Sequence, residues 1–231
     1  MKGFLIVLLF LSGNVMAQNN QVAHFSFWKP KPGQEINFEN GYKQHLNWHK
    51  VNGDTWAWYG WFIISGARDG QFVDVTFNHA WGDFDRSLKP AEDGADNQLH
   101  TYPFGDFVGR NKMVQVASLS ISDSNSLKSK FLRLVTVNVT DVVAGKKVIE
   151  KLKNTWQVAG LQSFMTFKLV DGGDLNQLIL LIGLNNFEEY SRFENLQEEL
   201  SSIEGAMKIK TINSITSETL VYRADMSLFP K

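Results

Sequence analysis

Two histidines four residues apart, His45 and His49, have the spacing that most directly allows chemistry. They fall in a run, 38–51, that is predicted to be helical, where side chains four apart point the same way. Two imidazoles placed like this are able to share one metal ion. The Glu of the zinc-protease pattern is missing from the run His45-Leu46-Asn47-Trp48-His49. The pair is therefore a candidate for a metal or haem iron, and histidines without a ligand are the simpler interpretation.

A third ligand would come from His79, near the end of a predicted strand, or from Asp83 or Asp85 just after it. His79 is also the candidate catalytic residue. It shares a strand face with Val73, Val75 and Phe77, and on a face that lined a cavity between sheet and helices it would be the one titratable group. Such a histidine suits a general base. The alternative is a core histidine that hydrogen-bonds to the backbone.

The opposite face of the same strand carries a polar row, Asp74, Thr76 and Asn78, beside Trp58 and Phe62. Polar groups on a buried face need partners or a wet cavity. An aromatic wall with a few polar groups is the usual build of a small-molecule site. The sequence therefore predicts a pocket for a small apolar or aromatic ligand, with these lining residues: Trp48, His49, Trp58, Trp61, Asp74, His79 and Trp81. The alternative is that the tryptophans only enlarge the core.

Composition excludes several function classes. The formal net charge is -1, and no long Lys/Arg block offers a surface for nucleic acid or an anionic membrane. The absence of Cys removes disulfides and thiol nucleophiles, and neither a Gly-rich phosphate loop nor a Gly-x-Ser-x-Gly turn is present. These absences select no reaction class, and the expectation is that no cofactor is bound.

The first residues predict export. A positive charge at Lys2 precedes an apolar run from Phe4 to Leu11, and Val15-Met16-Ala17 supplies small residues for cleavage. The run is shorter than the ~20 apolar residues that span a membrane. We expect residues 1–17 to be a signal peptide and the mature protein to be periplasmic or extracellular, with no membrane attachment after cleavage.

A displacement of 106 residues aligns two segments of the chain without a gap. Leu46 falls on Leu152, Trp58 on Phe164, Gly66 on Gly172 and Trp81 on Phe187. Internal repeats of this kind mark duplicated units. We expect one repeat over 18–125 and a second over 126–231. In this register His45 falls on Lys151, at the edge of a helix, and His49 falls on Thr155, near the buried stripe.

Each repeat is predicted to run strand, helix, two hairpin strands, helix, strand. The expected elements of the first repeat are 22–28, 38–51, 56–65, 71–80, a helix from residue 81, and 113–121. Those of the second are 131–139, 142–158, 162–170, 177–184, a helix from residue 186, and 208–228. The Pro-, Gly- and Asp-rich stretch 89–110 is expected to be an insertion loop, a lid or a binding loop. All five His and six of the seven Trp precede residue 101, which places the candidate site in the first repeat.

This element order is the split βαβ, ferredoxin-like unit of an α+β protein. Trp58/Phe62 and Tyr59/Trp61 make both faces of one strand apolar, so the face away from the helices must be buried too. We expect the two sheets to pack as an intramolecular α+β barrel, which a monomer completes, although a homodimer remains open.

The chain thus resembles the dimeric α+β barrel superfamily in a tandem form, above all in the stretch Trp61-Phe62-Ile63-Ile64-Ser65-Gly66 … Gly70-Gln71-Phe72-Val73. It looks most like secreted bacterial members of uncertain function. The resemblance implies a group that includes monooxygenases, haem-degrading enzymes, muconolactone-isomerase-like proteins and stress-responsive proteins, and it selects no reaction. The leading interpretation is an exported protein that binds a small apolar or aromatic ligand. The alternative is a cofactor-poor or haem- or metal-dependent enzyme that resembles a monooxygenase or an isomerase.

Overall fold

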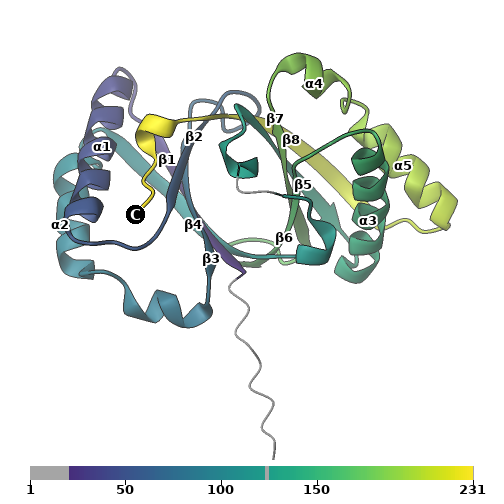
Figure 1. Cartoon of the computed structure of the whole chain (residues 1–231), viewed down its shortest axis with the longest axis horizontal. Coiled ribbons are helices and arrows are strands. Elements are labelled where there is room, and N and C mark those ends of the chain that lie inside the picture. Colours follow the sequence, from purple (N-terminus) through teal and green to yellow (C-terminus); the bar gives the residue numbers. More distant parts are fainter. Residues whose placement is uncertain (1–20, 123–124, 231) are drawn as a thin grey trace, which may run out of the picture.

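A computed structural model describes residues 21–122 and 125–230. Its eight strands form one closed antiparallel barrel in the order β1-β3-β2-β8-β5-β7-β6-β4. The helices lie outside the ring of strands, on two opposite sides of it (Figure 1). The expected signal peptide, 1–17, lies outside the described residues. Within the described ranges, no helix is both long and apolar enough to cross a membrane.

The elements of the two halves correspond one to one. The first half consists of β1 (Val22–Pro30), α1 (Glu35–Val51), β2 (Trp58–Ile63), β3 (Phe72–His79), the 3-10 helix η1 (Trp81–Arg86), α2 (Pro90–His100) and β4 (Gly105–Gln115). The second half consists of β5 (Phe131–Val139), α3 (Val142–Val158), β6 (Phe164–Asp171), β7 (Gln177–Leu184), α4 (Phe187–Ser191), α5 (Leu196–Met207) and β8 (Ile212–Tyr222). Short 3-10 turns follow β4, precede β5 and follow β8 at Ala117–Leu119, Ser126–Lys128 and Ala224–Met226.

The strand order confirms two ferredoxin-like repeats. The first half contributes β4-β1-β3-β2 and the second contributes β6-β7-β5-β8, which is the order of a split βαβ unit. Antiparallel pairing of β2 with β8 and of β4 with β6 joins the two sheets. Since each of the eight described strands has a neighbour on both sides, the barrel they form has no open sheet edge. The expected α+β fold is confirmed.

Three apolar layers hold this arrangement together. The barrel interior is filled from both halves, for example by Phe25 and Trp61 from one and Phe167 from the other. This confirms that the face away from the helices is buried against the other repeat. A second layer lies between the first sheet and α1, and a third between the second sheet and its helices.

The expected insertion loop over 89–110 is wrong. This stretch contains α2 and the first part of β4, the same two elements that the second repeat forms as α5 and β8. Pro90 occupies the first turn of α2, where proline is tolerated. None of the α2 residues is fully buried, so the apolar periodicity that reveals a helix is absent. The strand that follows begins at Gly105 rather than at Met113.

The repeat register also needs a correction within the first helix. Helix α1 begins at Glu35 and α3 at Val142. The displacement between these two positions is one residue longer than the displacement of 106 that aligns the hairpins. In this corrected register His45 and His49 take the places of Leu152 and Trp156, both fully buried. The loop between the helix and the hairpin, 52–57 in the first repeat and 159–163 in the second, is one residue longer in the first repeat, and a gap-free alignment hides that difference.

Candidate metal centre

Helix α1 presents its inner face as one continuous stripe. The stripe contains Phe38, Tyr42, His45, Leu46 and His49, spaced by three and four residues as on one side of a helix. His45 is 5% exposed and His49 is 4% exposed. Two imidazoles therefore stand where an ordinary helix of this fold has core residues, and their polar atoms need partners.

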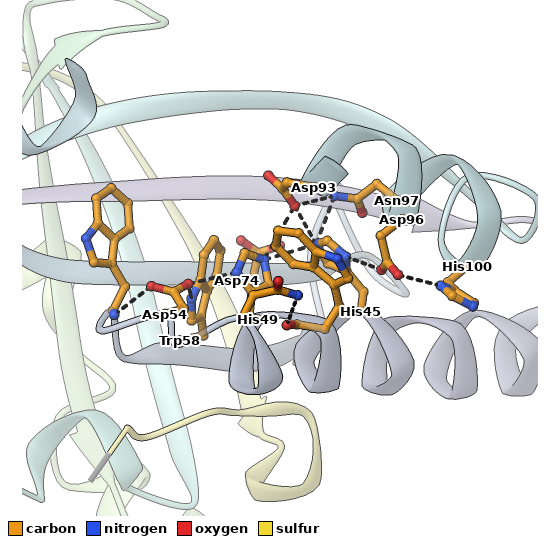
Figure 2. A network of polar contacts seen from close by, with 12 residues as sticks. His45, His49, Asp54, Trp58, Asp74, Asp93, Asp96, Asn97 and His100 are labelled. Atoms are coloured by element: carbon orange, nitrogen blue, oxygen red, sulfur yellow. Dashed lines mark hydrogen bonds and ion pairs between the residues drawn. The ribbon is translucent and has the colours of Figure 1, made fainter. Parts of the chain in front are cut away.

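Helix α2 supplies those partners because it lies unusually close to α1. A Cβ at Gly41 would lie 1.8 Å from the carbonyl oxygen of His100, so only glycine permits this approach. The contact brings the stripe Asp93, Asp96 and Asn97 of α2 opposite the two histidines (Figure 2).

Three ligand atoms converge between the helices. The Nε2 atoms of His45 and His49 are 3.2 Å apart, and Asp93 Oδ1 lies 3.3 Å from the first and 3.6 Å from the second. Nitrogen or oxygen ligands about 2.1 Å from one metal ion, at angles between octahedral and tetrahedral, are about 2.9–3.4 Å apart. The spacing of His45, His49 and Asp93 fits a single bound ion with little movement.

Carboxylates hold the far side of both imidazole rings. Asp96 Oδ2 lies 2.7 Å from Nδ1 of His45, and Asp54 Oδ2 lies 2.7 Å from Nδ1 of His49. Asp54 also accepts a hydrogen bond from the indole of Trp58, at 2.9 Å. A carboxylate behind each imidazole is the usual support of a metal-binding histidine, because it fixes the tautomer and the ring orientation.

These contacts allow a cation to bind between the facing nitrogen atoms. Asp96 only accepts hydrogen bonds, so Nδ1 of His45 carries the ring hydrogen and its Nε2 presents a lone pair. His49 presents a second lone pair at Nε2 in the tautomer whose ring hydrogen is on Nδ1, which lies 2.7 Å from Asp54 Oδ2. Burial lowers the pKa of His45, which keeps its ring neutral, and the contact with Asp96 opposes this effect only in part. Three acceptors, the two lone pairs and the Asp93 oxygen, then face one another. One donor lies among them, the amide Nδ2 of Asn97, at 2.9 Å from His45 Nε2. A metal ion satisfies all three acceptors at once.

The surrounding charges favour a cation as well. The side chain of Asp54 is only 6% exposed, and this burial by itself raises its pKa. Hydrogen bonds from His49, the Trp56 N–H and Trp58 outweigh burial and lower the pKa of Asp54 below its ordinary value. Asp54 therefore stays ionised at neutral pH. Together with Asp93 and Asp96 it surrounds the two rings with negative charge.

A cavity of about 280 Å³ opens beside the three ligands, on the sheet side of α1. We call it the inner cavity. One buried polar group in its wall is Asp74 of β3, which accepts a 2.9 Å hydrogen bond from the Trp28 indole. Burial raises the pKa of Asp74 to about 7, so this carboxyl exchanges a proton near neutral pH. Tyr42 closes the wall, and burial raises the pKa of its hydroxyl well above the ordinary value.

A second cavity of about 510 Å³, which we call the outer cavity, adjoins the first. Its own walls include Trp56, Phe84 and Lys112. The two cavities share these residues: His24, His49, Trp58, Asp93 and Arg110. Two of the three ligand residues thus face both compartments.

Haem does not fit the histidine pair. An axial ligand must point its nitrogen at an open, flat slot for the porphyrin. Here Nε2 of each histidine points at the other ring and at Asp93, so a porphyrin plane reaches neither nitrogen without displacing a ligand. The donor set suits a bare divalent ion.

Four of the residues predicted from the sequence come together. His49 and Trp58 border both cavities, Asp74 borders the inner one, and His45 is the second histidine of the ligand group. Trp48 packs outside the cavities, with its ring stacked 6.2 Å from that of His45.

The other predicted residues lie elsewhere. Trp61 is buried in the barrel interior, and Trp81 is 48% exposed on η1. Val73, Val75 and Phe77 also face the barrel interior, so the expected cavity between their face and the helices is wrong. His79 follows Asn78, whose positive φ of 64° breaks the alternation of the strand. The ring of His79 packs 3.9 Å from Trp56, at the end of β3.

The third ligand is not one of the residues expected from the sequence. His79, Asp83 and Asp85 are absent from the ligand group, and Asp93 takes that place. Asp96, Asn97 and Asp54 were missed with it. The signal for the α2 residues is polar: Asp93, Asp96, Asn97 and His100 recur at helical spacing.

Comparisons with known proteins support the fold. No protein-family model matches the chain, and no curated protein has a significantly similar sequence. Among solved structures, the chain is similar to a putative monooxygenase from Lactobacillus acidophilus NCFM, with 12% identity, a TM-score of 0.56, and coverage of 90% of this chain and 97% of that one. A mutant chlorite dismutase from Candidatus Nitrospira defluvii gives 7% identity, a TM-score of 0.57, and coverage of 90% and 93%.

A haem-binding protein from Thermus thermophilus gives 10% identity, a TM-score of 0.50, and coverage of 90% and 92%. These identities establish architecture rather than activity. The chain therefore has the two-repeat α+β barrel fold of chlorite dismutases and of the monooxygenase-like proteins that share it.

Proposed function

We propose that this protein is a non-haem, metal-dependent oxygenase-like enzyme whose divalent ion is held by His45, His49 and Asp93. The single observation that carries the proposal is the convergence of two Nε2 atoms and one carboxylate oxygen, with a carboxylate behind each imidazole. Two histidines and one carboxylate with open positions are the donor set of non-haem Fe(II) oxygenases.

The chain's own residues have distinct parts in this proposal. His45, His49 and Asp93 bind the ion, and Asp96 and Asp54 orient the two rings. When bound, the ion supplies open positions at which O₂ and a substrate are activated. Asp74 is not a ligand, and it is able to hold or release a proton inside the inner cavity near neutral pH.

The proposal favours the enzyme interpretation over a plain binding protein. The similarity to a putative monooxygenase supports it at the level of the fold. One of the solved proteins with this fold is a haem-binding protein. The geometry of the histidine pair favours a bare ion in this chain.

Metal binding is the first test. The protein is stripped with a chelator and titrated anaerobically with Fe(II), and separately with Zn(II), in a calorimeter. We expect one ion per chain, and its loss in His45→Gln and Asp93→Asn. His100→Gln is the matched control, because His100 contacts Asp96 at 3.1 Å and not the ligand group. A chain that takes up neither ion contradicts the proposal.

Oxygen chemistry is the second test. Oxygen uptake by the Fe(II)-loaded protein is followed with ascorbate as reductant and with small aromatic compounds as substrates. Uptake that depends on both iron and an aromatic compound supports an oxygenase. Metal binding without any such uptake retains the metal site and contradicts the reaction.

We further propose that the chain is exported and acts outside the cytoplasm as a monomer or a homodimer. The signal-like residues 1–17 support export, and the closed barrel, which one chain completes, supports a monomer. N-terminal sequencing of the protein from its host tests the cleavage after Ala17.

A further inference from the structure

We propose that the substrate is a planar aromatic carboxylate, with its ring in the outer cavity among Trp56, Trp58 and Phe84 and its carboxylate on Arg110. This inference rests on the proposed function, since it names the substrate class of that same site. It is carried by the shape of the outer cavity and by the distribution of charge around it.

The walls of the outer cavity are aromatic on several sides. The rings of Trp56 and Trp58 lie 6.3 Å apart at 32° to each other, and Phe84 meets Trp56 edge to face at 5.5 Å. Aromatic rings pack against other rings in these offset and edge-on geometries. The volume of about 510 Å³ falls in the range of small-molecule sites. The cavity therefore suits a flat ring better than a flexible chain.

One cation at this cavity has no acidic partner among the described residues. Arg86 is 3.1 Å from Asp83, and Lys112 is 3.1 Å from Asp171. Within the part of the chain that the structure describes, no ion pair involves Arg110, whose guanidinium lies 4.9 Å from the Phe107 ring. A guanidinium binds a carboxylate through two parallel hydrogen bonds, so Arg110 is ready to accept an anionic substrate.

Arg110 and the ligand residues His49 and Asp93 all border both cavities. A bound ring with its carboxylate on Arg110 therefore has the metal ligands at the same junction. His24 lines the junction too, and burial first, then the charges of Lys112 and Arg110, lower its pKa to about 4. His24 is consequently neutral at pH 7, and Arg110 provides the positive charge.

Benzoate, benzamide and cyclohexanecarboxylate separate the two parts of the proposal. Each is titrated into the Zn(II)-loaded and the metal-free protein, with calorimetry and intrinsic tryptophan fluorescence, to which Trp56 and Trp58 contribute, as readouts. We expect benzoate to bind at least about tenfold more tightly than neutral benzamide, the size of one charge-assisted contact. We expect the saturated acid to bind more weakly than benzoate, because it loses the ring contacts.

Arg110→Gln should remove the preference for benzoate over benzamide, while the protein still binds one Zn(II) ion. Arg86→Gln is the matched control, because it deletes the same charge from the same cavity at a residue already paired with Asp83. We expect it to keep the preference.

Three results overturn the inference: equal affinity for benzoate and benzamide, equal effects of the two arginine substitutions, or benzoate binding that needs the metal but not Arg110. Failure of the proposed function is separate, because it shows as absent metal binding. Arg110-dependent benzoate binding in the metal-free protein supports the aromatic carboxylate site even then.

Discussion

Asp96 touches no metal ion in the proposed site, yet its replacement should weaken metal binding. Its two oxygens contact His45 Nδ1 at 2.7 Å and His100 Nδ1 at 3.1 Å, and its side chain is 12% exposed. In Asp96→Asn the amide keeps the volume but removes the charge that fixes the His45 tautomer. Loss of such a supporting carboxylate typically costs 10–100-fold in metal affinity, or about 1.4–2.7 kcal/mol.

Thermal unfolding reports this loss directly. At a metal concentration of about 100 times the dissociation constant, binding stabilises the folded chain by about 2.7 kcal/mol. For a chain of this length that raises the melting temperature by roughly 5–11 °C. At the same metal concentration, Asp96→Asn should retain only about 0.4–1.4 kcal/mol of that stabilisation.

The matched control is Asp106→Asn, which makes the same chemical change at a carboxylate that is 68% exposed on β4. The metal-induced shift in the melting temperature of Asp106→Asn should equal that of the unaltered protein. If Asp96→Asn also keeps the full shift while Asp93→Asn abolishes it, then Asp96 does not orient His45. If neither substitution changes the shift, the ligand group itself is wrong.

Three further substitutions test other parts of the site. Gly41→Ala should destabilise the protein by about 1–3 kcal/mol in urea unfolding and weaken metal binding, because the new methyl displaces α2 from α1. Its control is Gly205→Ala on α5, where a Cβ would have no atom within 4 Å and the substitution should stabilise the protein by up to about 1 kcal/mol. Asp74→Asn should be the more stable form at neutral pH, because burial raises the pKa of Asp74 in the folded chain from 3.8 to about 7. The free energy of unfolding of the unaltered metal-free protein should therefore fall relative to that of the variant as the pH rises between these two values, and parallel pH profiles would contradict this. His79→Gln should leave the metal dissociation constant unchanged in calorimetry, because His79 packs on Trp56 and Phe84 outside the ligand group; a weaker constant would place it in the site.

The sequence predicted the parts of the fold whose periodicity is apolar. The hairpin strands of both repeats, α3 and β5 follow clear patterns of buried residues, and the two apolar faces of β2 required a second sheet. Helix α2 escaped because none of its side chains is fully buried, so its spacing is visible only in polar residues. A polar stripe does not indicate a packed helix face unless the helix that packs against it is known.

The site was predicted in the same uneven way. The spacing of His45 and His49 indicated a shared metal, since both lie on one local helix. Asp93 comes from a different helix, and only the close approach at Gly41 brings it within reach. Such a contact depends on the packing of elements remote in sequence, and no single-segment pattern contains it.

The far end of the chain completes the half that bears the site. After β8 the chain crosses to the first repeat, where Met226 is fully buried in the layer under α1 with Tyr42 and Phe72. Backbone hydrogen bonds of 2.8 Å in both directions join Leu228 to Trp58. During synthesis, helix α1 leaves the ribosome long before Met226 is made. The layer beneath the histidines is therefore complete only once Met226 has been made, and the fully packed candidate metal centre forms no earlier than that.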